Sequence, residues 1–246
     1  LTDILETGLC PSGIAGKMAG RLSWTCSAAA DKVGRAFIGP FYAQQHDPTP
    51  GDVVTQLMVR AITFWLGYFL LAAPVRRGLA RPRSTIRSWT DAAGHNRRLA
   101  AFVFIAGQWY WTSFQVSPAL FEQLVRRSDN YIGILELWAV CMVVATFGDE
   151  LAGNLWLDFI DNDGVLLSLT RGRGLGVDGT AIIGSFWHTM AALGIGFHGG
   201  RVESKSNVAD GPTREYFEYV QKLEAQWRAP RLPPWVWDIW SSGECA

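Results

Sequence analysis

The segment Leu155-Trp-Leu-Asp-Phe-Ile-Asp161-Asn162-Asp163-Gly164 places a carboxylate directly after a run of bulky apolar residues. Such a run is typical of a buried β-strand, and the Asn-Asp-Gly that follows predicts its end and a helix over 165–169. A side chain at the end of a strand in an α/β sheet lies at the crevice where these folds bind ligands. Asp161 is therefore either a ligand-binding carboxylate or the cap of the next helix, depending on whether other carboxylates reach the same point.

Composition restricts the class of protein. The 246 residues suffice for one large domain, or for a core domain with a smaller one. An apolar share of 49% against 18% charged residues indicates a globular chain rather than a disordered one. The formal net charge is zero, so a site for a polyanion has to come from local arginines. The four cysteines show no metal-ligand spacing, which favours reduced thiols in an intracellular protein, cytoplasmic or nuclear.

The chain begins Leu-Thr-Asp without Met or a signal pattern, so we expect it to be a piece of a longer product. Its most hydrophobic segment, 57–75, contains Arg60 and has an uninterrupted apolar part shorter than the roughly 20 residues that a membrane span needs. A buried helix is favoured, and no membrane is expected as a partner.

Three regions follow one another along the chain. Residues 1–78 have helical spacing throughout, including a long helix over 53–72 that Asp52 is expected to cap. An arginine- and proline-containing connection over 76–87 leads into an α/β domain, residues 79–228. A tail over 229–246, rich in Pro and Trp, either packs back onto the core or belongs to an interface.

The α/β domain is expected to contain a mixed five-stranded sheet flanked by helices. A meander of three strands comes first, and two parallel strands are then added through helices. The predicted strands are 86–92, 99–106, 108–116, 154–161 and 198–204, and the predicted helices are 130–147, 165–169, 178–193 and a closing helix over 212–227.

Three further carboxylates are candidates for the same site as Asp161. Asp91 lies late in the first strand, and Glu136 lies in an apolar helix face, where a lone ionised carboxylate is costly to bury. Asp210 begins the closing helix, where capping of that helix is an equal alternative. Four convergent carboxylates without a His or Cys set suit Mg²⁺ or Mn²⁺. Two such ions, about 3.5–4 Å apart, would activate a water and stabilise the leaving oxygen of a phosphodiester.

The four carboxylates and the order of elements between them resemble the Asp-Glu-Asp-Asp set of ribonuclease H. The phrase Ser204-Lys-Ser-Asn-Val-Ala-Asp210-Gly-Pro-Thr-Arg214 is similar to one typical of the ribonuclease H domain in retrotransposon and pararetrovirus-type reverse transcriptases. Ala19-Gly-Arg-Leu-Ser and Val33-Gly-Arg-Ala-Phe are similar to phrases of the helical region that precedes that domain. The resemblance covers nearly the whole chain and implies a ribonuclease H-like domain behind a helical connection or thumb-like region.

The resemblance also implies an activity, which is metal-dependent endonucleolytic hydrolysis of the RNA strand of RNA–DNA hybrids. Two Mg²⁺ or Mn²⁺ ions would be held by Asp91, Glu136, Asp161 and Asp210. The hybrid would be recognised by its shape and 2′-hydroxyls, with the substrate-binding residues Asn162, Lys205, Asn207 and Arg173. The reverse-transcriptase palm domain of the same polyprotein is the expected protein partner.

One departure from the family pattern keeps other hypotheses open. Cellular ribonucleases H carry a histidine in the loop before the last carboxylate, whereas this loop has Lys205 and Asn207 instead. This difference and the neutral charge favour a catalytically inactive ribonuclease H-like module that binds nucleic acid or protein, while the four carboxylates favour the enzyme. A transposase- or exonuclease-like use of the fold is a third hypothesis, against which the position of Glu136 argues. Arg173 lies in Gly172-Arg-Gly-Leu-Gly176, which follows a predicted helix and is therefore expected to be a connection rather than a nucleotide cradle.

Overall fold

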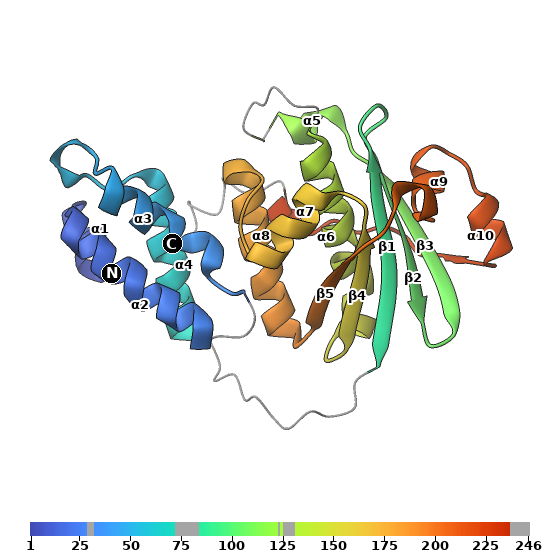
Figure 1. Ribbon diagram of the computed structural model, residues 1–246, viewed down its shortest axis with the longest axis horizontal. Coiled ribbons are helices and arrows are strands. Elements are labelled where there is room, and N and C mark those ends of the chain that lie inside the picture. The colour runs from blue at the N-terminus through green and yellow to red at the C-terminus, as the bar shows by residue number, and fades with distance from the viewer. Residues whose placement is uncertain (29–31, 72–83, 123, 125–130, 237–246) are drawn as a thin grey trace. The chain divides into compact units, whose positions relative to one another are not determined.

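The computed structural model describes residues 1–28, 32–71, 84–122, 124 and 131–236 (Figure 1). The chain divides into two compact units, Leu1–Leu79 and Ala80–Ala246, and each unit has a hydrophobic core of its own. Most of the predicted connection over 76–87 lies outside the described residues, as do Trp237 and Trp240 of the tail.

The first unit is built from helices. Their bounds are α1 Thr2–Thr7, α2 Ser12–Ala28, η1 Arg35–Phe37, α3 Gly39–His46, η2 Pro50–Asp52 and α4 Gln56–Leu71. Trp65 on α4 is fully buried at the centre of the unit. Gly34 has a φ of +81°, and a Cβ there would lie 2.3 Å from the Trp65 ring, so only glycine fits this close approach.

The prediction that Asp52 caps the long helix of this unit is wrong. Val53 instead forms an isolated β-bridge with Leu9, which keeps the chain extended beyond Asp52. The helix α4 therefore begins later, where the Thr55 hydroxyl accepts a hydrogen bond of 3.2 Å from the Met58 amide. Thr55 does the capping expected of Asp52.

The second unit is an α/β domain with a mixed sheet in the order β5-β4-β1-β2-β3-β6. The first three strands form the predicted antiparallel meander, β4 runs parallel to β1, and β5 runs parallel to β4. The sheet has six strands rather than the predicted five, because a two-residue strand pairs in parallel with β3. The strands are β1 Thr85–Ala93, β2 Arg98–Ile105, β3 Gln108–Gln115, β4 Leu155–Ile160, β5 Gly196–Arg201 and β6 Gln226–Trp227.

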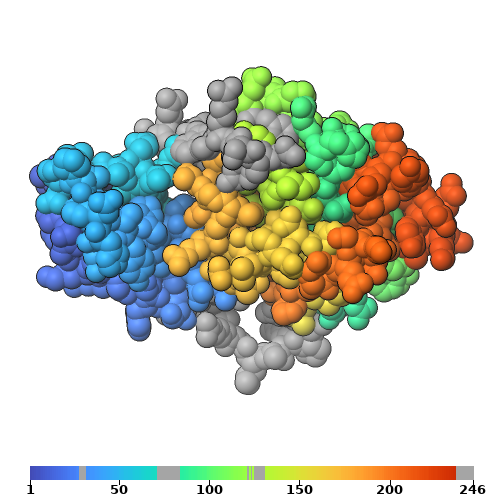
Figure 2. Space-filling view, turned by 45° about the horizontal axis from the view of Figure 1, so that its top comes forward, coloured from blue at the N-terminus to red at the C-terminus, as the bar shows by residue number. Residues whose placement is uncertain are grey.

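The extra strand replaces part of the predicted closing helix over 212–227, which is wrong. That segment forms only the short helices α9 Asp210–Thr213 and α10 Glu218–Lys222, which lie on the surface of the unit (Figure 2, orange-red). Glu215 and Glu224 have positive φ values of 66° and 48°, so the helical path breaks after each short helix. The chain then extends, and Trp227 packs edge-on against Trp111 of β3 with ring centroids 4.5 Å apart.

Three longer helices flank the sheet, namely α6 Ile132–Leu151, α7 Asp163–Arg171 and α8 Gly176–Leu193. The helix α6 packs on β1 and β2 on one side and on α8 on another, so its apolar surface forms the centre of the core. Among the described residues, α6 alone is long and apolar enough to cross a membrane, and most of it is buried inside this core. Trp235 and the fully buried Val236 also pack on the core, so the described part of the tail folds back onto the domain.

Candidate metal centre

Three of the four predicted carboxylates meet at one point. Asp91 lies on β1, Glu136 on α6, and Asp161 directly after β4, and each offers an oxygen within 4.8 Å of the others. The strand register explains why Asp91 and Asp161 are close. β1 and β4 are parallel neighbours, and Trp89 pairs with Phe159. Two residues further along each strand come Asp91 and Asp161, and α6, which crosses β1, brings Glu136 to them.

Two carboxylates of the cluster are buried, and two of the cluster's oxygens have no hydrogen-bond partner among the described residues. Asp91 and Glu136 are only 4% and 5% exposed. Glu136 Oε2 and Asp161 Oδ1 are buried and accept no hydrogen bond from the described protein. A buried carboxylate oxygen without a partner is costly, and the three carboxylates around one point form an all-oxygen donor set. This arrangement fits a hard divalent cation such as Mg²⁺ or Mn²⁺.

Burial and the neighbouring negative charges raise the pKa values of two carboxyl groups in the cluster. Burial, followed by the charges of Asp161 and Asp210, raises the pKa of Asp91 to about 7. Burial, followed by the charges of Asp91, Asp161, Asp158 and Asp210, raises the pKa of Glu136 to about 10. A cation at this point would favour the ionised carboxylates and reverse both shifts.

Asp161 does not cap the following helix. The N-cap of α7 is Asn162, whose Oδ1 accepts a hydrogen bond of 3.1 Å from the Val165 amide. The side chain of Asp161 therefore belongs to the carboxylate cluster, and its neighbour Asn162 caps α7. Asn162 is also a predicted substrate contact. Such a contact would have to leave its Oδ1 bonded to the Val165 amide.

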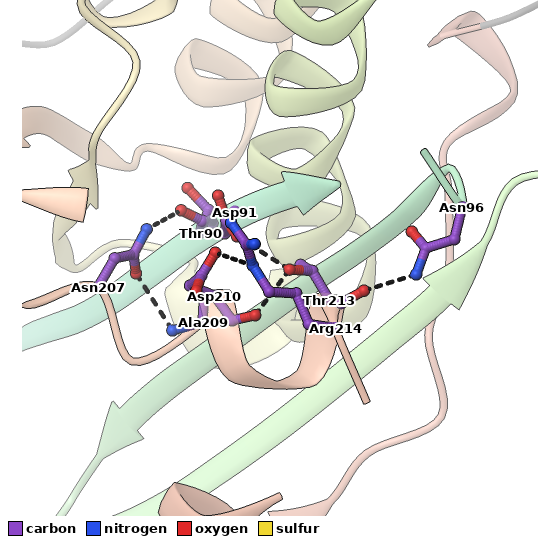
Figure 3. A network of polar contacts seen from close by, with 8 residues as sticks. All are labelled: Thr90, Asp91, Asn96, Asn207, Ala209, Asp210, Thr213 and Arg214. Carbon is purple, nitrogen blue, oxygen red and sulfur yellow. Dashed lines mark hydrogen bonds and ion pairs between the residues drawn. The ribbon is translucent and has the colours of Figure 1, made fainter. Parts of the chain in front are cut away.

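Asp210 stands apart from the other three carboxylates. It is the first residue of α9, and its Oδ1 accepts a hydrogen bond of 2.8 Å from Arg214 Nε (Figure 3). The N-cap position of α9 is occupied by Ala209, so the capping alternative does not describe Asp210. Its charge nevertheless contributes to the raised pKa values of Asp91 and Glu136, which places it beside the cluster without joining it.

The short helix α9 is fastened to the end of β1 by buried contacts that the sequence did not reveal. The Thr213 hydroxyl lies 3.1 Å from Asp91 Oδ2, and Asn96 Nδ2 donates a hydrogen bond of 2.8 Å to the Thr213 carbonyl (Figure 3). Thr213 is fully buried. The phrase Asp-Gly-Pro-Thr-Arg therefore supplies a contact to Asp91 as well as the carboxylate of Asp210.

Asn207, another predicted substrate contact, is bonded inside the protein. Asn207 is buried, and its Nδ2 donates a hydrogen bond of 2.9 Å to the Thr90 carbonyl (Figure 3). Its Oδ1 accepts one of 3.2 Å from the Ala209 amide. Both ends of the amide are used inside the protein, so Asn207 ties the last loop to β1.

Lys205 and Arg173, the other predicted substrate contacts, are exposed. Lys205 lies on the 3₁₀ turn η3, Ser204–Ser206, and Arg173 lies between α7 and α8. The Gly172–Gly176 segment is a connection, as expected, because Gly172 ends α7 in the left-handed conformation and the Gly174 amide bonds to Thr180 Oγ1 at 3.2 Å.

Asp158 is a fifth carboxyl group, which sequence reasoning missed. It is fully buried on β4, where its Oδ1 accepts from Ser88 Oγ at 2.6 Å and its Oδ2 from Thr90 Oγ1 at 3.1 Å. Burial raises its pKa to about 7, and the two hydroxyls act in the opposite direction. The sequence does carry a signal for this residue. Asp158 lies two residues from both Trp156 and Ile160, so it shares the buried face of the strand with them.

Comparison with protein-family models and with curated proteins finds no match to this chain.

Proposed function

We propose that this chain is a ribonuclease H-like module of a retroelement reverse transcriptase that hydrolyses the RNA strand of RNA–DNA hybrids. The observation that carries the proposal is the meeting of Asp91, Glu136 and Asp161, with buried oxygens that lack protein partners. The strand order supports it, because a three-stranded meander with parallel additions on the β1 side is the arrangement expected from the resemblance.

Each carboxylate has a role in this proposal. Asp91, Glu136 and Asp161 hold one divalent cation, and Asp210 completes the site for a second. Bound Mg²⁺ or Mn²⁺ would activate the attacking water and stabilise the charge on the leaving oxygen. Thr213 orients Asp91 through its hydroxyl, and the burial of the cluster excludes bulk water from its inner side.

Substrate recognition is proposed to be independent of base sequence. The exposed Lys205 and Arg173 are suited to contact phosphates, which position a nucleic acid without reading its bases. The hybrid itself is distinguished by its shape and 2′-hydroxyls. The palm domain of the same polyprotein, in an intracellular setting, is the proposed partner.

Cleavage of a labelled RNA–DNA hybrid tests the proposal. We expect the wild-type chain to cut the RNA strand only with Mg²⁺ or Mn²⁺, and Asp161→Asn to lose at least about a hundredfold in rate. Asp163→Asn is the matched control, because it makes the same change two residues away on an exposed side chain paired with Arg201. Absence of metal-dependent cleavage by the wild type, or full activity of Asp161→Asn, contradicts the enzymatic proposal.

The second candidate function is an inactive ribonuclease H-like scaffold that binds nucleic acid or protein. The separation of Asp210 from the three-carboxylate cluster favours it, because a two-ion site needs all four groups. Thermal melting distinguishes the candidates, since an intact site is stabilised by millimolar Mg²⁺ or Mn²⁺. A melting temperature that does not respond to either ion favours the scaffold.

A further inference from the structure

Asp210 and Arg214 form an ion pair at the rim of the carboxylate cluster. Arg214 Nε lies 2.8 Å from Asp210 Oδ1, one helical turn away, and the two side chains are 58% and 39% exposed. Exposed ion pairs of this kind are worth at most about 1 kcal/mol, so a competing cation can replace the guanidinium. The hydrogen bond is therefore short, but its small free energy allows a divalent cation to replace the guanidinium.

The backbone beneath this pair is fixed, in contrast to the pair itself. Thr213 is fully buried against Asp91, and Asn96 holds the Thr213 carbonyl, so α9 is fastened to the end of β1 (Figure 3). Asp210 is thus carried beside the cluster while its carboxylate is bonded to Arg214. A change of side-chain rotamer, without movement of α9, is the smallest step that would turn Asp210 towards the cluster.

We propose that Arg214 is a displaceable counter-ion that holds Asp210 until a second divalent cation takes its place. The inference rests on the proposed function in one respect, which is that the carboxylate cluster binds divalent cations. The first cation binds at Asp91, Glu136 and Asp161 without disturbing the pair. The second competes with Arg214 for Asp210 and binds more weakly for that reason.

The proposal predicts that substitution of Arg214 changes the affinity of the second ion but not that of the first. Arg214→Gln removes the bond that competes for Asp210, so the second ion is expected to bind roughly three- to tenfold more tightly. The first ion is expected to change by less than about twofold, because its three ligands do not contact Arg214. Arg214→Lys keeps the charge but loses the planar guanidinium, and an intermediate result is expected.

Calorimetric titration of the full chain with MnCl₂, without nucleic acid, measures both ions separately. Arg228→Gln is the matched control, because Arg228 pairs with Glu150 at 3.1 Å with similar exposures of 40% and 31%. Glu150 follows Glu136 by 14 residues on α6, about 21 Å along the helix, so this control removes an equivalent pair far from the site. Neither ion should respond to it.

A double variant separates competition from a general charge effect. In an Asp210→Asn background the second ion should be lost or strongly weakened, and adding Arg214→Gln should then have no effect. The proposal is overturned if Arg214→Gln leaves the second ion unchanged, if Arg228→Gln gives the same change, or if Arg214→Gln still acts without Asp210. A wild-type chain and an Arg214→Gln variant that both bind no Mn²⁺ overturn it together with the proposed function. If the second ion responds as expected but no hybrid is cleaved, the counter-ion role stands and the nuclease proposal fails.

Discussion

The Thr213 hydroxyl lies 3.1 Å from Asp91 Oδ2 and 2.7 Å from the Asp210 carbonyl, so its single proton is shared between two groups of the site. The first of these contacts joins residues 122 positions apart in the chain. It connects β1 to α9, the two elements that carry Asp91 and Asp210. One buried side chain therefore orients a carboxylate and sets the position of the turn that carries another.

This contact predicts a difference between two substitutions of Thr213. Thr213→Val keeps the shape but removes the hydrogen bond to Asp91, so we expect divalent-cation affinity to fall roughly five- to tenfold. Thr213→Ser retains the hydroxyl and should remain within about twofold of the wild type. Titration with Mn²⁺ measures both, and equal affinities for the Val and Ser variants would show that the hydroxyl does not orient Asp91.

Asp161 and Asn162 are adjacent, and their substitutions should have opposite consequences. Asn162→Ala removes the cap of α7 and is expected to cost about 1 kcal/mol of unfolding free energy, with or without Mg²⁺. Asp161→Asn removes a charge from a crowded cluster, so the metal-free protein should be equally or more stable. Only the Asp161 variant should lose the stabilisation by Mg²⁺. Denaturant unfolding in EDTA and in Mg²⁺ gives both quantities, and a Mg²⁺ response that survives in Asp161→Asn would remove Asp161 from the site.

The stability of the metal-free protein should fall as pH rises from about 4 to 7. The pKa values of Asp91 and Asp158 are raised to about 7, above the ordinary value of 3.8, so the folded state holds protons that the unfolded state has released. Their stabilisation is complete below the unfolded pKa and is lost as pH rises through the folded one, and the pKa of Glu136, raised to about 10, continues this loss above pH 7. Denaturant unfolding in EDTA between pH 5 and 8 measures this slope. Mg²⁺ should reduce or reverse it, because a bound cation favours the ionised form of Asp91.

The sequence was sufficient for the first five strands of the sheet and for the three carboxylates that meet. The meander and the β4 strand follow from hydrophobic period, and in the observed β1–β4 register Asp91 and Asp161 each lie two residues beyond the Trp89–Phe159 pair. Glu136 was identifiable because an ionised carboxylate in an apolar helix face requires a cation or a metal. These features follow from the local hydrophobic pattern and from the parallel pairing of β1 with β4.

The remaining errors come from tertiary contacts that no local pattern contains. The predicted closing helix fails because pairing with β3 and the Trp111–Trp227 contact outweigh helix propensity after α10. The buried bond from Asn207 to the Thr90 carbonyl, 117 positions away in the chain, is another contact that no local pattern contains. Asp158 went unnoticed because its partners, Ser88 and Thr90, belong to another strand.

The buried group around Ser88 provides the last prediction. Ser88 Oγ accepts from Trp156 Nε1 at 2.7 Å and lies 2.6 Å from Asp158 Oδ1, to which it donates. Ser88→Ala removes both bonds and leaves a buried donor and a buried acceptor without partners, which should cost about 2–4 kcal/mol of unfolding free energy. Thr112→Val is the matched control, because Thr112 is fully buried on β3 of the same meander and its hydroxyl has no hydrogen-bond partner among the described residues.

Thr112→Val should be neutral or stabilising, since the substitution removes an unsatisfied hydroxyl and keeps the volume of the side chain. Denaturant unfolding of both variants in EDTA measures the two changes against the same wild type. If Ser88→Ala costs no more than Thr112→Val, the Ser88–Asp158 bond carries no stability. In that case Asp158 is held on β4 by the surrounding packing and by its bond to Thr90, without a contribution from Ser88.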